Sequence, residues 1–149
     1  TDPLTPLQLE GEGGTVEVIP FYQQHGRIRS LGYKIGNMAY SSDISELPEE
    51  SVKFIEGVDV WIVDALRQTP HPTHFHLEKT IEHIERLNVK KAYLTNLHID
   101  MDYATLCKDL PDHIRPAYDG LEIYLGYFCP EILFQQLIPL HAITKTFRR

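Results

Sequence analysis

The hydrophobic and polar positions of the chain follow strand-like and helix-like periods in turn. Apolar and polar residues alternate through Thr15–Pro20, which predicts a strand with one buried face. The nearly continuous apolar runs Val58–Val63 and Ala92–Leu97 predict strands that are covered on both faces. A last short strand is expected at Leu121–Leu125.

Turn signals indicate a hairpin between the first strand and the apolar runs. The dipeptide Gly36-Asn37 lies between Leu31–Ile35 and Met38–Tyr40, where it favours a tight connection of antiparallel strands. The chain is therefore expected to begin with an antiparallel section.

Helical spacing appears further along the chain. Apolar residues recur every three or four positions as far as Leu87, which predicts a helix from about Thr73 to Leu87 with Thr73 as its N-cap. Shorter helices are expected at Pro48–Ile55 and Tyr103–Leu110. Strands that alternate with helices after an antiparallel section are typical of an α/β layered domain.

Composition narrows the class of protein. The 149 residues, 42% of them hydrophobic, suffice for one domain, and no apolar run approaches the length of a membrane helix. Without such a run we expect no membrane partner. The net charge is −7 and the basic residues are scattered, so we expect no broad electrostatic binding to nucleic acid, whereas a local site for an anionic substrate stays open. Cys107 and Cys129 lie far apart and are expected to be free thiols in the cytoplasm.

Four polar residues fall where predicted strands or loops end. Imidazole and carboxylate groups together suit zinc, manganese or iron, and the lack of a nearby cysteine argues against a structural zinc site. Their spacing forms no local motif, so the sequence indicates a candidate site and leaves its geometry open. The four residues are His25, Asp43, His74 and His98.

Each of these residues also has a simpler interpretation. His25 can be a loop histidine beside a glycine, and Asp43 can begin a turn by bonding its own backbone. His98 can be a histidine packed under a loop, and we favour a solvated acidic face for Asp100 and Asp102. These alternatives stay open on the residues alone.

A separate histidine pair lies at the predicted start of the long helix. His74 and His76 flank Phe75, and backbone N–H groups at a helix N-terminus favour an anion such as phosphate. The alternative is an exposed helix start that happens to be rich in histidine.

Several blocks of the chain together resemble the metallo-β-lactamase superfamily. The similarity covers about Thr15 to Leu125, and the blocks occur in the order of the family: QQHGRIRSLGYKIG, AYSSDIS, WIVDALRQTPHPTHFHLEKTIEHI, AYLTNLHIDMDY and PAYDGLEI. Within the superfamily the chain looks most like the branch of phosphoribosyl cyclic phosphodiesterases and, more distantly, tRNase Z. The resemblance implies an α/β fold that is the C-terminal half of a four-layer αββα sandwich.

The resemblance also implies roles for the four polar residues. His25 and His98 match histidine ligands of a dinuclear metal site, and Asp43 matches its bridging carboxylate. His74 matches the histidine that assists phosphate binding or protonates the leaving oxygen. The cofactors so implied are two divalent metal ions, zinc or manganese, with iron as a further candidate.

Two departures from the family pattern stand out. The HxHxDH motif, which supplies most of the metal ligands in the family, does not occur in this chain. Many relatives also have Thr-His at the end of the strand where this chain has Thr95-Asn96. His98 lies two positions further on and, on a strand, would face the same side as position 96.

These observations lead to an expectation about organisation. We expect residues 1–126 to form the C-terminal half of a metallo-β-lactamase-like domain and residues 127–149 to form a tail. A half sandwich leaves an apolar sheet face uncovered, so we expect a homo-oligomer or pairing with the missing N-terminal half. The chain alone is then expected to be inactive or nearly so.

The function expected from the resemblance is a metal-dependent phosphodiesterase that acts on a small cyclic phosphate or a nucleotide-like ester. One alternative is a non-catalytic half-fold that serves as a subunit or binding module. Another is a different hydrolase of the same fold, of the thioesterase or lactamase type.

Overall fold

The structure is a computed structural model that describes residues 3–125 and 136–139. The chain divides into two compact units, Thr1–Pro116 and Ala117–Arg149. The second unit contains an antiparallel pair, β8 (Glu122–Leu125) and β9 (Gln136–Pro139). Strand β8 agrees with the strand expected at Leu121–Leu125, whereas most of the expected tail and Cys129 lie outside the described residues.

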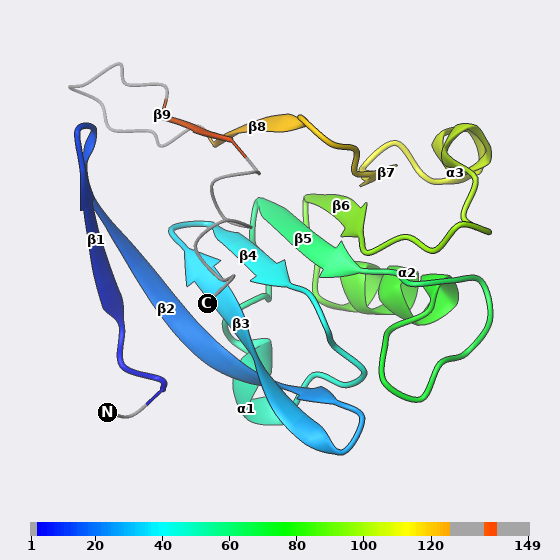
Figure 1. The fold of residues 1–149 in the computed structure, drawn as a ribbon, viewed down its shortest axis with the longest axis horizontal. Helices are drawn as coiled ribbons and strands as arrows, with labels where there is room; N and C mark the ends of the chain where they lie inside the picture. The colour runs from blue at the N-terminus through cyan, green and yellow to red at the C-terminus, as the bar shows by residue number, and fades with distance from the viewer. Residues whose placement is uncertain (1–2, 126–135, 140–149) are drawn as a thin grey trace. The chain divides into compact units, whose positions relative to one another are not determined.

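The first unit begins with four consecutive antiparallel strands (Figure 1). These are β1 (Leu7–Gly11), β2 (Gly14–His25), β3 (Ile28–Ile35) and β4 (Met38–Ser41). Ile35 pairs with Met38 across the two-residue turn, which confirms the predicted hairpin. Strand β1 was not expected, because all of its residues are exposed and the sequence there shows no buried face.

Beyond β4 the sheet becomes parallel. Strands β5 (Val60–Asp64), β6 (Lys91–Thr95) and β7 (Ile114–Pro116) follow β4 in order, each parallel to its neighbour. All five residues of β5 are buried, as its continuous apolar run predicted. The sequence did not indicate β7, which is short and carries an arginine and a proline.

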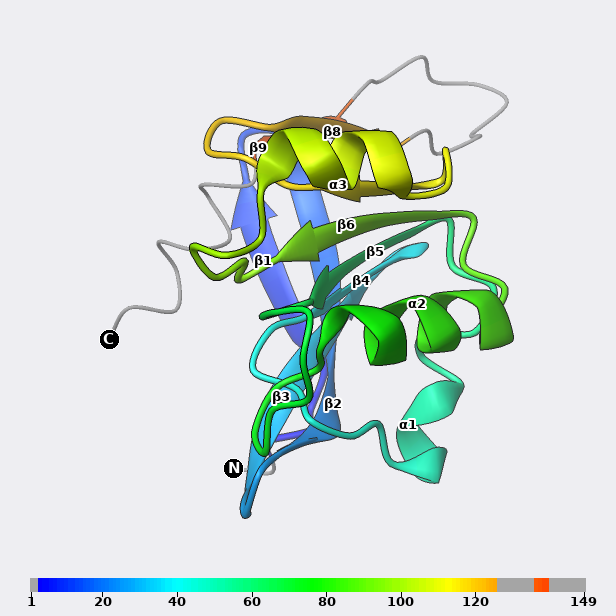
Figure 2. The ribbon, with the colours of Figure 1, turned by 90° about the vertical axis from the view of Figure 1, so that its right-hand side faces the viewer.

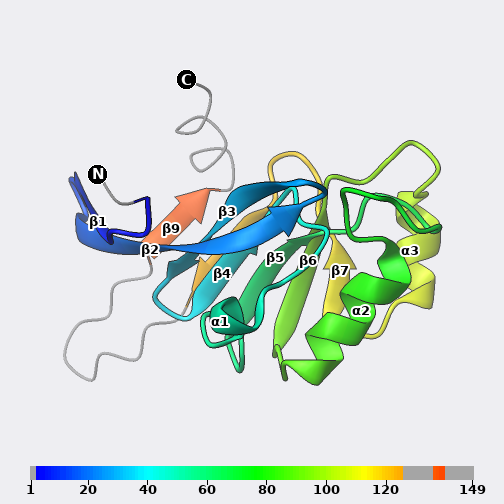
Figure 3. The same cartoon turned by 90° about the horizontal axis from the view of Figure 1, so that it is seen from below.

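Helices form the connections between the parallel strands. Helix α1 (Glu49–Val52) follows β4, α2 (Leu77–Arg86) follows β5, and α3 (Tyr103–Asp109) follows β6. Figures 2 and 3 show α1 and α2 against the same face of the sheet. This alternation confirms the predicted α/β class.

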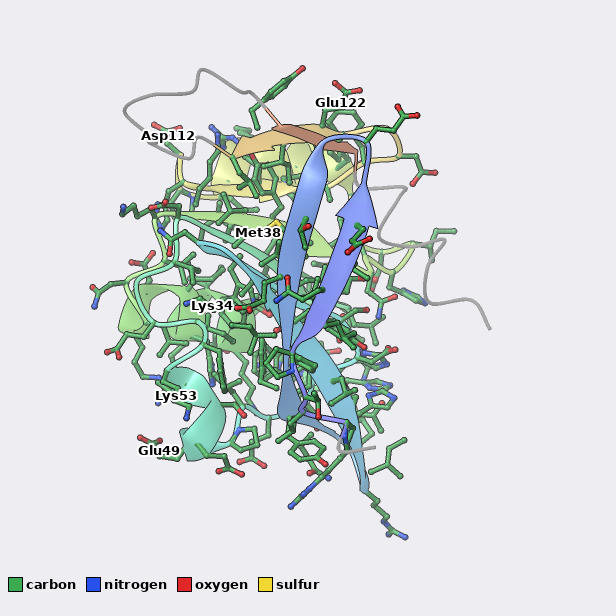
Figure 4. All side chains as sticks on the ribbon, turned by 90° about the vertical axis from the view of Figure 1, so that its left-hand side faces the viewer. Lys34, Met38, Glu49, Lys53, Asp112 and Glu122 are labelled. Atoms are coloured by element: carbon green, nitrogen blue, oxygen red, sulfur yellow. The ribbon has the colours of Figure 1, made fainter. Side chains whose placement is uncertain are left out.

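Helix α1 is short and its two faces differ. Glu49 and Lys53 are exposed and point away from the sheet (Figure 4). Ser51 is buried and donates a hydrogen bond to the Tyr22 carbonyl of β2. The helix therefore packs on the strand that ends at His25.

The start of α2 corrects one prediction. The helix begins at Leu77 with His76 in extended conformation at the N-cap position, so Thr73 is not its N-cap. The Phe75 N–H donates instead to the Ile44 carbonyl at 2.6 Å, and the Leu66 N–H donates to the Phe75 carbonyl at 2.9 Å. These bonds hold residues 66–75 as a loop against the end of β4, because the backbone groups are used across the sheet edge rather than along a helix.

The main core lies between the sheet and its helices. Trp61 and Leu94 from the sheet pack with Ile84 of α2 and Leu106 of α3, and each is at most 2% exposed. The Trp61 indole donates to Ser41 Oγ at 3.1 Å, so the one buried polar atom of this ring is satisfied. No helix among the described residues is both long and apolar enough to cross a membrane.

Gly32 on β3 leaves the space that its neighbours on β2 occupy. A Cβ at this position would lie 2.8 Å from Gln23 Oε1 and would also collide with the Phe21 ring. Both neighbours are buried, so neither can withdraw without disturbing the sheet.

We predict that Gly32→Ala destabilises the protein by about 1–3 kcal/mol, the usual effect of overpacking. Chemical denaturation of the variant and the wild type measures the difference. The control is Gly11→Ala, because a Cβ at Gly11 meets nothing within 4 Å. Equal stability of Gly32→Ala and the wild type would contradict this account of the packing.

Candidate metal and catalytic site

The site lies where several strands of the first unit end at one edge of the sheet. Strands β2, β4, β5 and β6 run in the same direction, so their carboxyl ends meet there. His25 ends β2, Asp43 follows β4, Asp64 ends β5, and Asn96 follows β6. Ligand sites of open α/β sheets form at such an edge.

A tight turn positions His25. It pairs with Ile28 in the last step of the β2–β3 ladder, and Gly26 between them has φ +60°. A Cβ on Gly26 would approach Thr73 to 2.6 Å, so glycine allows the turn to contact the loop before α2. His25 Nδ1 donates to the Thr73 carbonyl at 2.7 Å, which leaves Nε2 as the acceptor or ligand atom.

Asp43 projects into the same region. Its side chain is 58% exposed, and its backbone has φ +54°, in the left-handed region that few residues other than glycine adopt. The next residue, Ile44, is fully buried and anchors the chain behind it. The carboxylate is therefore free of the core while its backbone is fixed.

A buried carboxylate orients His74. His74 Nδ1 lies 2.6 Å from Asp64 Oδ2, and Asp64 itself is fully buried. Asp64 Oδ2 also accepts from the Ile44 N–H at 3.3 Å. Burial raises the pKa of the Asp64 carboxyl above its ordinary value, and the hydrogen bond from His74 opposes that rise.

The structure brings three of the four expected residues together. Three possible ligand atoms lie within 4.8 Å of one another, one each from His25, Asp43 and His74. The two imidazole rings are 4.7 Å apart between centroids, and His74 Nδ1 is 3.8 Å from Asp43 Oδ1. Two imidazoles and a carboxylate suit zinc or manganese, and each ring already has an oxygen partner on Nδ1, as metal-binding histidines generally do.

The structure places His98 apart from this group. Its side chain is 55% exposed and its Nδ1 lies 2.7 Å from Asp100 Oδ1, while its backbone N–H donates to the Leu66 carbonyl. Asp100 and Asp102 are both exposed, as expected of a solvated acidic face that leads into the next helix. Asp102 also accepts from the Thr105 N–H at 2.8 Å and so caps α3.

Asn96, which follows β6, lies next to His74. Asn96 has φ +60°, and its Nδ2 lies 3.4 Å from His74 Nδ1. The side chain of Asn96 thus lies beside the ring of His74. His76, the other histidine of the expected anion site, occupies the N-cap position of α2.

Asp64 is a residue of this candidate site that the sequence pattern did not single out. It ends the apolar run VWIVD, and an acid at the carboxyl end of a buried parallel strand is itself a signal. That signal does not reveal its partner, because His74 is ten residues away in a loop without regular structure.

One solved structure resembles this chain in both sequence and fold, and one curated protein resembles it in sequence. A solved structure described as a new diphosphatase from the PhnP family is 32% identical, with a TM-score of 0.76, and the match covers 83% of this chain and 47% of that one. Among curated proteins, an octanoyltransferase from Porphyromonas gingivalis is 34% identical over 111 residues, which are 72% of the chain and 22% of that protein.

Two more distant structures share the fold. The metallo-β-lactamase fold protein YhfI from Bacillus subtilis is 15% identical with a TM-score of 0.62, over 78% of this chain and 51% of its own. The short form of human tRNase Z is 18% identical with a TM-score of 0.51, over 66% of this chain and 42% of its own. The chain thus spans about half the length of the solved structures it matches, and less than a quarter of the curated protein.

The family match agrees with the fold and with the site. The family described as the β-lactamase superfamily domain matches residues 2–99, a range that contains every strand and loop of the site. Proteins of this fold family are typically hydrolytic and generally use divalent metals such as zinc. The chain belongs to the metallo-β-lactamase superfamily and forms part of such a domain.

Proposed function

We propose that the chain carries the C-terminal part of the active site of a metal-dependent phosphodiesterase. The observation that supports this most is the group of His25, Asp43 and His74, with His74 held by a buried carboxylate. The 32% identity to a diphosphatase of the PhnP family favours phosphoryl chemistry over other hydrolysis. The proposed substrate is a small phosphate ester, cyclic or nucleotide-like.

His25 and Asp43 would hold the metal. His25 offers Nε2 because its Nδ1 is used by the Thr73 carbonyl, and Asp43 offers an exposed carboxylate that can bridge two ions. When bound, divalent ions lower the pKa of an attacking water and neutralise charge on phosphoryl oxygens. The donor types present fit such ions.

His74 lies with the two proposed ligands, but we assign it to the substrate rather than to the metal, because its Nε2 cannot be a metal ligand and a proton donor at once. Its Nδ1 proton is directed to Asp64, so Nε2 is the atom that faces outward. The N–H group at Nε2 can donate a hydrogen bond to a phosphoryl oxygen of the bound substrate, or it can transfer its proton to the leaving oxygen as the P–O bond breaks. Asp64 fixes the ring orientation and stabilises the ring's positive charge before that transfer.

Metal binding tests the proposed ligands directly. We predict that His25→Ala and Asp43→Ala each weaken the binding of Zn²⁺ or Mn²⁺ at least about tenfold, because each removes a direct ligand. Isothermal titration of the chain with each ion, supported by elemental analysis, measures the change.

The matched control is His113→Ala, because His113 is also a histidine paired with a carboxylate, Glu85, at 2.9 Å. His98→Ala is expected to behave like this control. A loss of affinity in His98→Ala equal to that in His25→Ala would show instead that His98 is recruited as a ligand. Unchanged affinity in His25→Ala and Asp43→Ala would reject the metal site.

Catalysis tests the role of His74 and Asp64. In the full-length protein we predict that His74→Ala and Asp64→Asn lower kcat about 10²–10⁴-fold, the range for loss of a positioned proton donor. The rate of hydrolysis of bis-p-nitrophenyl phosphate gives kcat for each variant, and His113→Ala is the control.

A parallel assay with an acyl thioester and with a β-lactam decides between hydrolase types. Faster turnover of the thioester would replace the proposed phosphodiesterase by an acyl hydrolase. If His25→Ala, Asp43→Ala and His74→Ala all keep wild-type activity, the chain is a non-catalytic half-fold and the proposal fails.

A further inference from the structure

Asp43 has a backbone conformation that needs support. Among the described residues, Asp43, Asn88 and Asn96 are the residues other than glycine with positive φ. Asn88 follows the C-terminal end of α2, where a left-handed residue is common. Asp43 does not follow a helix, and although aspartate enters the left-handed region more readily than most residues, hydrogen bonds from the surrounding structure can hold it there.

Side chains from the β2–β3 hairpin supply that support. Gln23 on β2 is fully buried, and its Nε2 donates to the Ser42 carbonyl and approaches the Asp43 carbonyl to 3.4 Å. Ser30 on β3 donates from Oγ to the Asp43 carbonyl at 2.8 Å. The carbonyl groups before and after the Cα of Asp43, those of Ser42 and of Asp43 itself, are thus both held by side chains that are distant in sequence.

The cost of burying Gln23 indicates that its amide donor is needed. Its Oε1 is buried without a hydrogen-bond partner among the described residues, and an unpaired buried acceptor costs about 1–3 kcal/mol. Leucine would fill similar space without that cost. Gly32 on the neighbouring strand leaves room for this same oxygen.

The position of Gln23 relates the two expected metal ligands. Residues two apart on a strand face the same side, so Gln23 and His25 share a side of β2. One residue of the strand therefore holds the backbone of Asp43, while the residue two positions later presents an imidazole to the Asp43 carboxylate. A shift of β2 would displace both together.

We propose that Gln23 is a positioning residue that holds Asp43 in its left-handed conformation and so aims the carboxylate at His25. Ser30 assists through the Asp43 carbonyl. The claim that these hydrogen bonds favour metal binding rests on the proposed function. The claim that they hold the Asp43 backbone does not.

The test compares Gln23→Leu and Gln23→Glu with the wild-type chain. Leucine removes the donor and the unpaired acceptor, and glutamate keeps the shape but replaces the donor with an acceptor. We expect Gln23→Leu to keep or raise the melting temperature while Co²⁺ affinity falls about tenfold and the visible spectrum of bound Co²⁺ changes. Gln23→Glu is expected to lose affinity as well.

The control for a merely structural effect is Ile84→Val, which shortens a fully buried side chain of α2. It is expected to lower stability and to leave the Co²⁺ affinity and the spectrum of bound Co²⁺ unchanged. Wild-type affinity and spectrum in Gln23→Leu would overturn the proposal. If Gln23→Leu does not fold, Ser30→Ala serves instead, because it removes one hydrogen bond to the Asp43 carbonyl. An unchanged Co²⁺ affinity in Ser30→Ala would then overturn the proposal.

Backbone NMR shifts of Ser42 and Asp43 separate this proposal from the proposed function. If the wild type binds no Co²⁺, the metal-dependent function fails, but changed shifts in Gln23→Leu still support the positioning role. Unchanged shifts in Gln23→Leu reject the positioning role whether or not the metal binds.

Discussion

The buried carboxylate of Asp64 connects most of the parts that form the site. Its Oδ2 bonds His74 Nδ1 at 2.6 Å and accepts from the Ile44 N–H at 3.3 Å. The backbone carbonyl of Asp64 accepts a hydrogen bond from Thr80 Oγ1 of α2 at 2.8 Å. One residue at the end of β5 thus joins the exit from β4, the loop before α2 and the helix itself. A buried charge needs such partners, because its desolvation is costly when it stands alone.

The same edge of the sheet carries the strained backbone. Asp43 and Asn96 both have positive φ and follow strands on either side of β5. A left-handed backbone is held where the surrounding structure over-determines it, and at Asp43 the side chains of Gln23 and Ser30 do so. Rigid support beneath an exposed carboxylate is what a metal ligand requires, because ligand geometry must be fixed before the ion arrives.

Family membership and function rest on different grounds. The family match and the shared fold establish the metallo-β-lactamase superfamily, and with it a hydrolytic fold that generally uses divalent metals. Phosphodiester chemistry is a proposal supported by the local site and by one relative with 32% identity. The octanoyltransferase match covers only 22% of that protein, so its name says nothing about which part performs the transfer.

The sequence by itself determined the α/β class, the hairpin at Gly36-Asn37 and the buried β5, because alternation and continuous apolar runs are local signals. It also indicated His25, Asp43, His74 and His98 as candidate residues of one site, of which the structure groups the first three. It could not place the start of α2, since the Phe75 N–H bonds to Ile44 across the sheet edge rather than along a helix. Only the tertiary structure decided that Asp64 holds His74, that His98 turns to Asp100, and that Gln23 supports Asp43. The contacts of Asp64 with His74 and of Gln23 with Asp43 depend on how strands and loops meet at the edge of the sheet, which no local pattern encodes. His98 and Asp100 are only two residues apart, and the conformation of the loop after β6 brings their side chains together.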